Sequence, residues 1–437
     1  MALINENSEP IVSPELDIFS VIPTQVGALS GYYTEIAPLS NDYISNLESA
    51  IEFNISPGVE QYIDLSKTLM YVKAKVTKLD GTSTDDDDSK KCSLINAGLH
   101  SFFSSAELYL NDVLISEPIS KSYVYKAYMS TLLNATKTHK DTLGKANFYY
   151  KDTSKTIASN EGFKSRAERM ALSKTFEMID YLQFDFMNQS KYLINQVGIK
   201  LRFHPNQRSF ILWTDGTDYM LKLLEVKLMV RYVNIESKLL LEHQKTLDKG
   251  ITCKYMFDRV SQRQFQLSKE DLSKHFENLF LNKIPSQILI CLVSSSAFNG
   301  SLNSNPLYFN HYNISNITLA IDNVPIPRAP FKLNFAENIY IEAYHHLFRS
   351  LNYTDIDDSN IDLSINDYKN GYTIFGFSTE PELRESPNIN LLRTGNVSLT
   401  LTFKSALTEA VTLIVFSSTP SLVEINSARQ VTHDFTA

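Results

Sequence analysis

Leu108-Tyr109-Leu110-Asn111-Asp112-Val113-Leu114-Ile115 decides the fold, because a matching order of residues returns in the second half of the chain. The second copy reads Leu319-Ala320-Ile321-Asp322-Asn323-Val324-Pro325-Ile326. Each copy has an apolar strand, an Asn/Asp pair able to adopt the left-handed conformation of a tight turn, and a short returning strand. Prolines follow both copies. After the prolines, the segments 125–134 and 341–352 each have an apolar Ala-Tyr face, which predicts a buried helix in each copy. The sequence therefore predicts a hairpin followed by a helix, twice.

Two further pairs of alternating apolar segments follow the hairpins in the same order. The matched segments are 197–203 with 397–403 and 226–230 with 411–415. A strict period of two places one apolar face of each strand against a core. Three matched features in the same order predict a duplicated all-β domain. In this alignment Phe203 and Phe403 are expected at equivalent inward positions.

Length and composition agree with two large β domains. The chain has 437 residues, and a β sandwich with long insertions often reaches about 200 residues, so two domains fit better than three. The 23 Tyr and 25 Phe residues favour strands and broad contacts between sheets over helical bundles. The run Ile288–Val293 is apolar at every position, which suits a strand buried on both faces.

The chain is predicted to have five parts. They are an extended N-terminal arm (1–24), a first β domain (25–235), a linker helix (236–250), a second β domain (251–425) and a polar C-terminal tail outside the sandwich (426–437). Apolar residues spaced three and four apart predict the linker helix.

The charge distribution does not suggest nucleic-acid binding. The formal net charge is −8, and ten Asp and Glu residues precede the first cation, Lys67. An acidic arm without a cation cannot neutralise phosphates, so we expect no direct contact between this arm and nucleic acid.

The cysteines and the apolar runs indicate in which cellular compartment the protein is expected. Cys92, Cys253 and Cys291 lie far apart and lack metal-ligand spacing, so we expect buried thiols in a reducing compartment. The acidic N-terminus lacks the apolar region of a secretory signal. No apolar run approaches the ~18 residues of a membrane span.

Two polar segments are predicted to be loops. Asp85–Asp88 is expected to be a solvated loop tip, because a block of like charges repels itself and stays exposed. Thr136–Lys174 is a long insertion rich in Lys, Ser and Thr, and insertions of this size are usually functional or mobile. We expect changes in either segment to spare folding.

The chain offers few residues for catalysis or metal binding. His345 and His346 are adjacent on a predicted helix and point about 100° apart, so they suit solvated or packing histidines better than one metal site. Asp355-x-Asp357-x-Ser359 has the opening spacing of a calcium loop, but the sixth position is Asn360 instead of Gly. No nucleophile elbow, P-loop or dinucleotide fingerprint occurs. We predict no catalytic residue, no cofactor site and no metal ligand, and hence no enzyme.

Several segments of the chain, taken together, resemble the Polinton/Maverick (adintovirus-like) major capsid proteins. The opening resemblance lies in Pro14–Phe19, Pro23–Gln25, Ile51–Ile55 and Tyr62–Thr68. Later matching segments are Phe186–Gln189, Tyr192–Asn195, Ala297–Ser301, Asn305–Pro306, His311–Asn313 and Tyr368–Thr373. The resemblance extends from about residue 14 to Ile425, although the loops at 85–88 and 136–174 are specific to this chain.

The resemblance implies a double jelly roll, in which two eight-stranded sandwiches stand in tandem, joined by short helices. It implies a structural protein of the virion that is made and assembled inside the host cell. Its first partner would be itself, as a homotrimer and then as neighbouring pseudo-hexameric capsomers of an icosahedral shell around double-stranded DNA. A penton or minor capsid protein would occupy the vertices.

Two other function classes stay open from the residues alone. A carbohydrate-active enzyme built on two jelly rolls would require convergent carboxylates with a shifted pKa. A glycan-binding or minor capsid module would normally need one jelly roll, so the duplication argues against it. Sandwiches host many functions, which is why the strands alone do not choose between these classes.

Overall fold

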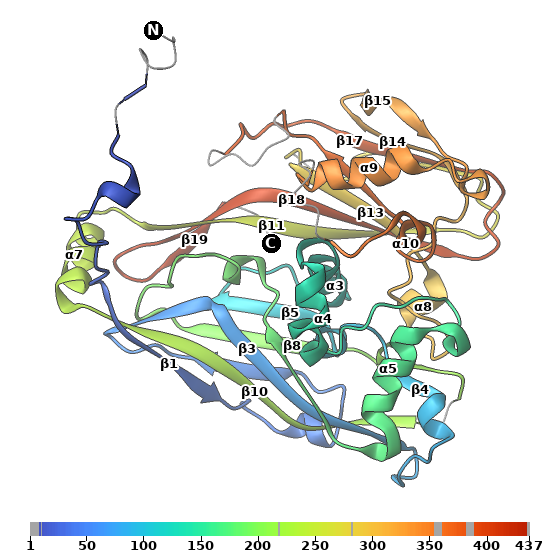
Figure 1. Ribbon diagram of the computed structural model, residues 1–437, viewed down its shortest axis with the longest axis horizontal. Helices are drawn as coiled ribbons and strands as arrows, with labels where there is room; N and C mark the ends of the chain where they lie inside the picture. The colour runs from blue at the N-terminus through green and yellow to red at the C-terminus, as the bar shows by residue number, and fades with distance from the viewer. Residues whose placement is uncertain are drawn as a thin grey trace.

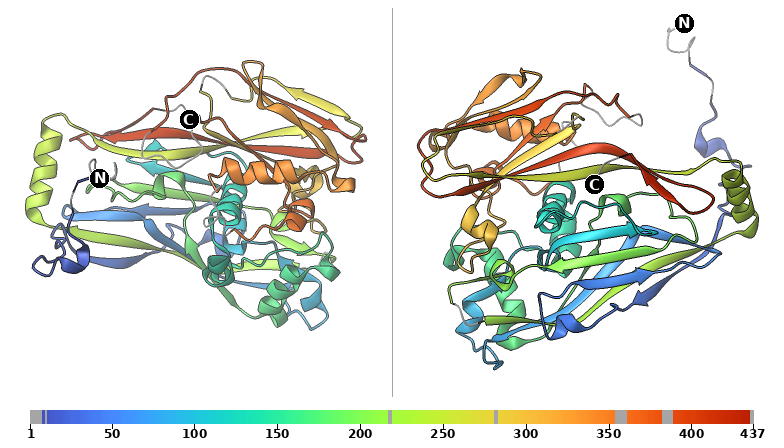
Figure 2. Two further views of the ribbon diagram at one scale, coloured as in Figure 1. Left: turned by 45° about the horizontal axis from the view of Figure 1, so that its top comes forward. Right: turned by 180° about the vertical axis from the view of Figure 1, so that it is seen from behind.

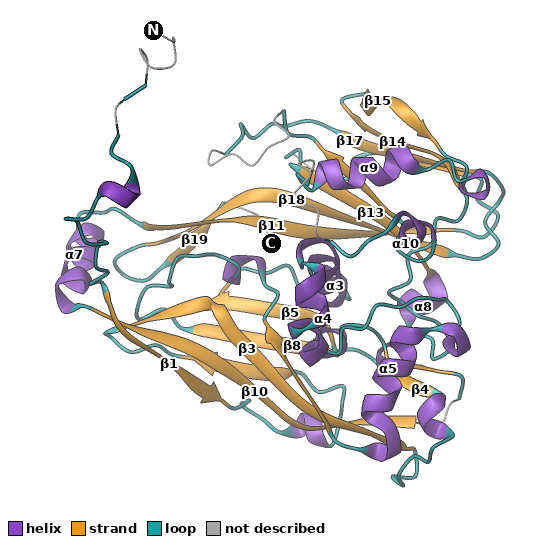
Figure 3. Ribbon diagram, viewed as in Figure 1, coloured by secondary structure: helices purple, strands orange, loops and turns teal. Residues whose placement is uncertain are grey.

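The computed structural model describes residues 8–9, 11–216, 219–280, 283–353, 361–381 and 389–434. Two β sandwiches lie side by side, with the N-terminal half below and the C-terminal half above in Figure 1. Helices gather between them at one end, whereas the linker helix α7 joins them at the other, as Figure 3 shows.

The first sandwich packs a four-stranded sheet of order β1-β10-β3-β7 against a four-stranded sheet of order β2-β8-β5-β6. The bounds are β1 Ala28–Ile36, β2 Ile51–Ile55, β3 Gln61–Lys78, β5 Phe103–Leu110, β6 Val113–Leu114, β7 Phe176–Tyr181, β8 Ile199–Pro205 and β10 Tyr219–Ile235. Every second residue of β8 from Ile199 to Phe203 is buried, as the apolar alternation predicts.

The second sandwich packs a sheet of order β11-β18-β13-β16 against a four-stranded sheet of order β12-β17-β14-β15, and β19 pairs with β18 beside this path. The bounds are β11 Cys253–Leu267, β12 Ser273–Phe276, β13 Gln287–Ser294, β14 Ile314–Ile321, β15 Val324–Lys332, β16 Ile374–Ser378, β17 Val397–Phe403, β18 Val411–Ile425 and β19 Val431–His433. The expected fully buried strand is β13, whose residues 288–293 are all buried.

The two halves have the same strand order. The strands of the first sandwich correspond one to one, in chain order, to β11 through β18 of the second. In chain order they are β1, β2, β3, β5, β6, β7, β8 and β10. With this correspondence both sheets have the same order of strands in the two sandwiches. Eight antiparallel strands in two such sheets form a jelly roll. The prediction of two tandem jelly rolls in an all-β chain is therefore confirmed, with β19 as an additional strand in the second.

The repeated hairpin turn is the same in both copies. Asn111 and Asp112 have φ values of 44° and 65°, and Asp322 and Asn323 have 48° and 66°, which is the left-handed pair of a tight hairpin turn. Asn111 Oδ1 accepts a hydrogen bond from the Gly198 N–H at 2.7 Å, and Asp322 Oδ1 accepts one from Asn396 at 2.8 Å. Each turn thus holds the start of the neighbouring strand.

This shared geometry corrects the predicted alignment of β8 and β17. Ala106 and Ile317 lie the same number of residues before their hairpin turns, so they are equivalent positions. Ala106 lies opposite Phe203 in the first half, and Ile317 lies opposite Leu401 in the second. Phe203 is therefore equivalent to Leu401, two residues from the predicted Phe403. Both Phe side chains are buried as expected. A shift of two keeps every side chain on its face, so alternation alone could not detect it.

The helices lie mostly in the connections between strands. Their bounds are α2 Gly98–Ser101, α3 Ser122–Asn134, α4 Lys137–Asp141, α5 Glu161–Met170, α6 Arg208–Ile211, α7 Ser237–Asp248, α8 Ser295–Asn299, α9 Ile341–Ser350 and α10 Ile365–Lys369. The short strands β4 Cys92–Leu94 and β9 Leu212–Thr214 pair with each other beside them. The two helices predicted after the hairpins are α3 and α9.

The C-terminal tail does not lie outside the sandwich as expected. β19 pairs with β18, Val423 lying opposite His433 and Ile425 opposite Val431. The Arg429 guanidinium donates to the backbone oxygen of Asn195 at 2.9 Å and to its side-chain oxygen at 2.8 Å. The polar composition hid this strand, because only Val431 turns a buried side chain inward.

The insertion 136–174 is a packed part of the protein, which overturns the expectation that it is a dispensable loop. Phe148, Tyr149 and Phe163 within it are buried, as are the polar side chains of Lys140 and Arg166. The many Lys, Ser and Thr residues suggested solvent exposure. The structure instead uses buried polar groups of this segment to bind backbone carbonyls, as described below.

Candidate functional site

The residues considered as metal ligands do not converge. His345 is exposed, whereas the His346 ring packs edge-on against Phe331 and its Nδ1 lies 2.7 Å from the Gly376 oxygen. Burial holds the pKa of His346 below its usual value. Asp355, Asp357, Ser359 and Asn360 lie outside the described residues, and within the described ranges there is no group of three or more His, Cys, Asp or Glu residues that could hold a metal ion.

The acidic run is only partly a solvated tip. Asp85, Asp86 and Asp87 are exposed, but Asp88 pairs with Lys78 at 2.8 Å and accepts a hydrogen bond from the Tyr219 hydroxyl at 2.9 Å. The hydrogen bond from Lys78 is the largest cause that lowers the pKa of Asp88 to about 2. Asp88 therefore ties the loop to β3 and β10.

The cysteines are free, and two of them match the expectation of burial. Cys92 and Cys291 are buried, whereas Cys253 is half-buried at the start of β11. Burial raises the pKa of the Cys253 thiol, while Arg429 and Lys191 nearby oppose that shift. Cys253 lines a surface pocket together with Leu247 and Ile251.

The feature that distinguishes this chain from two independent sandwiches is their shared junction. Helix α3, which belongs to the first jelly roll by sequence, packs with the hydrophobic core of the second. Tyr125 of α3 stacks on Phe298 of α8, with ring centroids 5.6 Å apart and planes within 9°. The Tyr125 hydroxyl donates to the Pro306 oxygen at 3.1 Å, and the ring of Tyr128 contacts Phe309 at 5.9 Å.

The ammonium group of Lys121 lies beside this aromatic contact. Lys121, at the start of α3, donates through Nζ to the backbone oxygen of Phe298. The same Nζ lies 4.5 Å from the ring centre of Phe210 and 5.0 Å from that of Phe298, which is cation–π distance. Burial lowers the pKa of Lys121 to about 8. The ammonium is thus held by a carbonyl and two rings that come from both halves.

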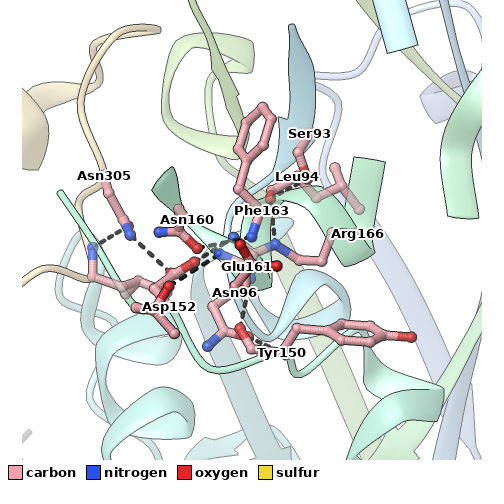
Figure 4. A network of polar contacts seen from close by, with 12 residues as sticks. Ser93, Leu94, Asn96, Tyr150, Asp152, Asn160, Glu161, Phe163, Arg166 and Asn305 are labelled. Atoms are coloured by element: carbon pink, nitrogen blue, oxygen red, sulfur yellow. Dashed lines mark hydrogen bonds and ion pairs between the residues drawn. The ribbon is translucent and has the colours of Figure 1, made fainter. Parts of the chain in front are cut away.

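A buried polar network extends the junction (Figure 4). The guanidinium of Arg166, fully buried on α5, donates to the oxygens of Leu94 at 2.8 Å and Tyr150 at 2.6 Å, and it pairs with Asp152 at 2.7 Å. The other carboxylate oxygen of Asp152 accepts from the Asn305 amide of the second half at 2.9 Å. Buried charges require such partners, so the insertion is fixed to both jelly rolls.

A second contact region lies toward α7. Phe186 packs edge-on against Tyr255 at 5.8 Å and Phe257 at 5.5 Å, both on β11. The Tyr255 hydroxyl accepts a hydrogen bond from the Ile194 N–H at 3.0 Å. Core clusters on both sides of the junction contain residues from both halves, so neither half closes its core alone.

Between these regions lies a cavity of about 490 Å³. Lys126 of α3 forms an ion pair in it with Asp185, which also accepts the Val260 N–H at 2.9 Å. Asp258 lines the same cavity, and its pKa is raised by burial and by the carboxylates of Glu380 and Asp185. Asp185 is occupied in joining α3 and β11, so these carboxyls do not form a free acid and base pair.

Sequence reasoning missed most of these junction residues. The Ala-Tyr face of α3 was predicted to be buried, although its partners in the second half were not. Arg166 and Asp152 gave no signal, since a lone Arg in a polar segment is normally solvated.

Comparisons with known proteins place the architecture. No protein-family model matches the chain. A Caenorhabditis elegans protein described as uncharacterised is 27% identical over 367 residues, which make up 82% of this chain and 86% of that protein. A chain in the cryo-EM structure of the Sputnik virophage aligns with a TM-score of 0.65 at 11% identity, covering 98% of this chain and 93% of that one.

Two solved structures described as major capsid proteins are also similar. The mavirus major capsid protein aligns with a TM-score of 0.56 at 13% identity, over 98% of this chain and 96% of its own. The Faustovirus major capsid protein aligns with a TM-score of 0.59 at 8% identity, over 96% and 93%. At this level of identity the likeness concerns the fold, and the chain is a double jelly roll along nearly its whole length. Among the described helices, none has the length and apolar character needed to cross a membrane.

Proposed function

We propose that this chain is a structural major capsid protein that trimerises into pseudo-hexameric capsomers. The observation that carries the proposal is the junction, which fixes two jelly rolls of identical strand order side by side as one body. Three such bodies around a threefold axis place six similar sandwiches in a ring. A ring with nearly sixfold shape can tile a closed shell.

The finer assignment is to the Polinton/Maverick (adintovirus-like) capsid proteins. The segments that resemble this group support it, and so does the fold shared with the mavirus major capsid protein. A relative in a nematode, similar over most of both chains, fits an element that resides in animal genomes. The protein would be made and assembled inside the host cell and would then form the capsid of the virion.

The partners follow from that role. The chain would contact itself within the trimer, then neighbouring capsomers, and a penton or minor capsid protein at the vertices. The shell would enclose double-stranded DNA without a direct grip by the acidic arm. The division into arm, first jelly roll, linker helix, second jelly roll and tail belongs to the same proposal, with the tail revised to include β19.

The carbohydrate-active alternative has one observation in its favour, namely Asp185 and Asp258 in the central cavity. The use of Asp185 as a clamp between Lys126 and Val260 argues against it. We therefore favour a structural role over catalysis.

Light scattering behind a sizing column tests the proposal directly. The subunit mass is 49.7 kDa, so the trimer should elute as a species of roughly 150 kDa across the micromolar range. Negative-stain images should then show hexagonal particles, or shells at high protein concentration. A monodisperse monomer under these conditions would contradict the capsomer proposal and return weight to the enzyme.

A further inference from the structure

The segment before β1 exposes apolar side chains that find no place on their own subunit. In this arm, residues 11–26, the exposed fractions are 93% for Ile11, 91% for Phe19 and 90% for Val21. The arm leaves the body beside α7 and projects away from it, as Figures 1 and 2 show. Its charged residues are Glu15 and Asp17, and it carries no cation. An apolar and acidic segment held in solvent suits a contact with another surface.

A pocket of suitable chemistry lies at the same end of the molecule. This pocket, here called the α7 pocket, has a volume of about 250 Å³, and Tyr192, Leu247, Ile251 and Cys253 are among its lining residues. The exposed fractions of Ile251 and Tyr192 are 56% and 37%, so its apolar wall is open to solvent. The volume suits one or two apolar side chains and is below that of most small-molecule sites.

The charge around the α7 pocket is complementary to the arm. Lys191 and Lys254 line it, and the Lys254 ammonium lies 3.9 Å from the Glu424 carboxylate, at the limit of an ion pair. The Lys191 ammonium donates to the Lys254 carbonyl at 2.9 Å, which leaves its charge without a carboxylate partner among the described residues. In the larger central cavity the lining cation is Lys126, which already pairs with Asp185, so that cavity suits an acidic segment less well.

We propose that the arm of one subunit docks in the α7 pocket of a second copy of this chain, with Phe19 or Ile18 in the pocket and Glu15 and Asp17 beside Lys191 and Lys254. This inference rests on the proposed trimer. Arm and pocket are different surfaces, so their contact is of the head-to-tail kind, which closes into a ring when three copies share a threefold axis. Both lie at the α7 end of the subunit, so the proposed contact forms at that end of the trimer.

Cys253 gives the test a natural reporter inside the pocket. Phe19→Cys should form a disulfide with Cys253 of the neighbouring subunit under mild oxidation, and a non-reducing gel should show dimer and trimer bands. Cys92 and Cys291 are buried and do not compete. Two controls should stay monomeric on the gel, namely Phe19→Cys with Cys253→Ser, and Leu39→Cys, whose exposed position lies beyond the end of β1 that is remote from α7.

Charge reversal separates docking from random collision. Lys191→Glu with Lys254→Glu should slow crosslinking of Phe19→Cys several-fold at low salt, and added Glu15→Lys with Asp17→Lys should restore it. Faster-migrating monomers, which report a disulfide within one subunit, would overturn the exchange, as would the absence of any crosslink. Light scattering of the natural protein keeps the two proposals apart. A natural trimer whose Phe19→Cys variant fails to crosslink refutes only the docking, and a natural protein that is monomeric refutes the capsomer itself.

Discussion

Arg166 carries a charge in a fully buried position and depends on Asp152 to balance it. Asp152→Ala leaves the guanidinium without its carboxylate and also removes the acceptor of the Asn305 amide, so we expect a loss of about 3–5 kcal/mol in the free energy of unfolding. The control is Glu161→Ala, which breaks an exposed pair with Lys164 in the same insertion and should cost about 0–1 kcal/mol. Urea denaturation measures both. Equal stability of the two variants would contradict the buried network.

The two hairpin turns allow a paired measurement. Asn111→Ala and Asp322→Ala each remove the oxygen that accepts a strand N–H, and each leaves an Ala in the left-handed region. We expect a loss of about 1–3 kcal/mol from each, because a hydrogen bond and a favourable turn residue are lost together. Thermal melts should show similar shifts for the two variants. A large shift for one and none for the other would show that the turns are not equivalent.

The environment of His311 predicts that the folding stability of the protein falls at acidic pH. Its ring stacks on Phe335 at 4.1 Å and its Nδ1 accepts the Asn313 N–H at 2.9 Å. Burial lowers the pKa of His311 from 6.5 to about 4. Between these values the unfolded chain binds a proton that the folded chain does not, so stability is full above pH 6.5 and is lost as the pH falls towards 4.

The test is the melting temperature between pH 7 and pH 5. His311→Asn keeps an acceptor for the neighbouring N–H and should show a smaller fall in melting temperature than the natural protein. His345→Asn, at an exposed position of α9, is the control and should behave like the natural protein. If the His311 variant shows the same fall, the half-buried neutral ring is not a source of acid sensitivity.

At the scale of elements, the sequence predicted those features that depend on neighbouring residues alone, namely the hairpin turns and the inward faces of strands. The hairpin turns require left-handed residues, and Asn and Asp adopt this conformation more readily than most residues, so both turns could be found from the sequence. The inward faces of β8 and β17 followed from alternation, but their mutual register did not, since a shift of two residues preserves the faces. β19 escaped because its polar composition gives no apolar alternation, although it pairs with β18, the strand that precedes it in the chain.

The insertion 136–174 is the element for which the structure reverses the expected outcome. Replacing residues 137–173 by a short Gly-Ser linker should abolish soluble expression, because it removes Phe163 and Tyr149 from the junction core and Asp152 from the buried network. The matched change is Asp86→Ser with Asp87→Ser in the exposed part of the acidic loop, which should change stability by less than about 0.5 kcal/mol. A soluble, cooperatively melting linker variant would restore the view of a dispensable loop.

At the scale of the whole molecule, the duplication was predictable because three local patterns recur in the same order. These patterns are the hairpin with its helix and the two alternating strands, and each can be recognised without knowledge of tertiary contacts. The junction was not predictable, since it pairs α3 of one half with α8 and Phe309 of the other. Aromatic residues such as Tyr125 and Phe298 look like ordinary core residues in the sequence. Only the placement of both jelly rolls shows that they face each other.

The junction leads to the last prediction, which concerns the isolated first half. A chain ending at Asp248 keeps every strand of the first jelly roll but loses the partners of Tyr125 and Tyr128 on α3 and the second-half residues that surround Trp213 and Phe163. We expect it to aggregate, because these large apolar side chains would form a contiguous exposed patch.

Light scattering behind a sizing column measures the result, with a matched truncation as control. A chain beginning at Gln25 lacks the exposed arm but keeps the whole junction, so it should remain soluble and fold cooperatively. This control separates the loss of the junction from the effect of truncation itself. A monodisperse half-chain ending at Asp248 would mean that the first jelly roll closes its core alone. The two sandwiches would then be independent domains, and the rigid pairing on which a pseudo-hexagonal trimer depends would lack its physical basis.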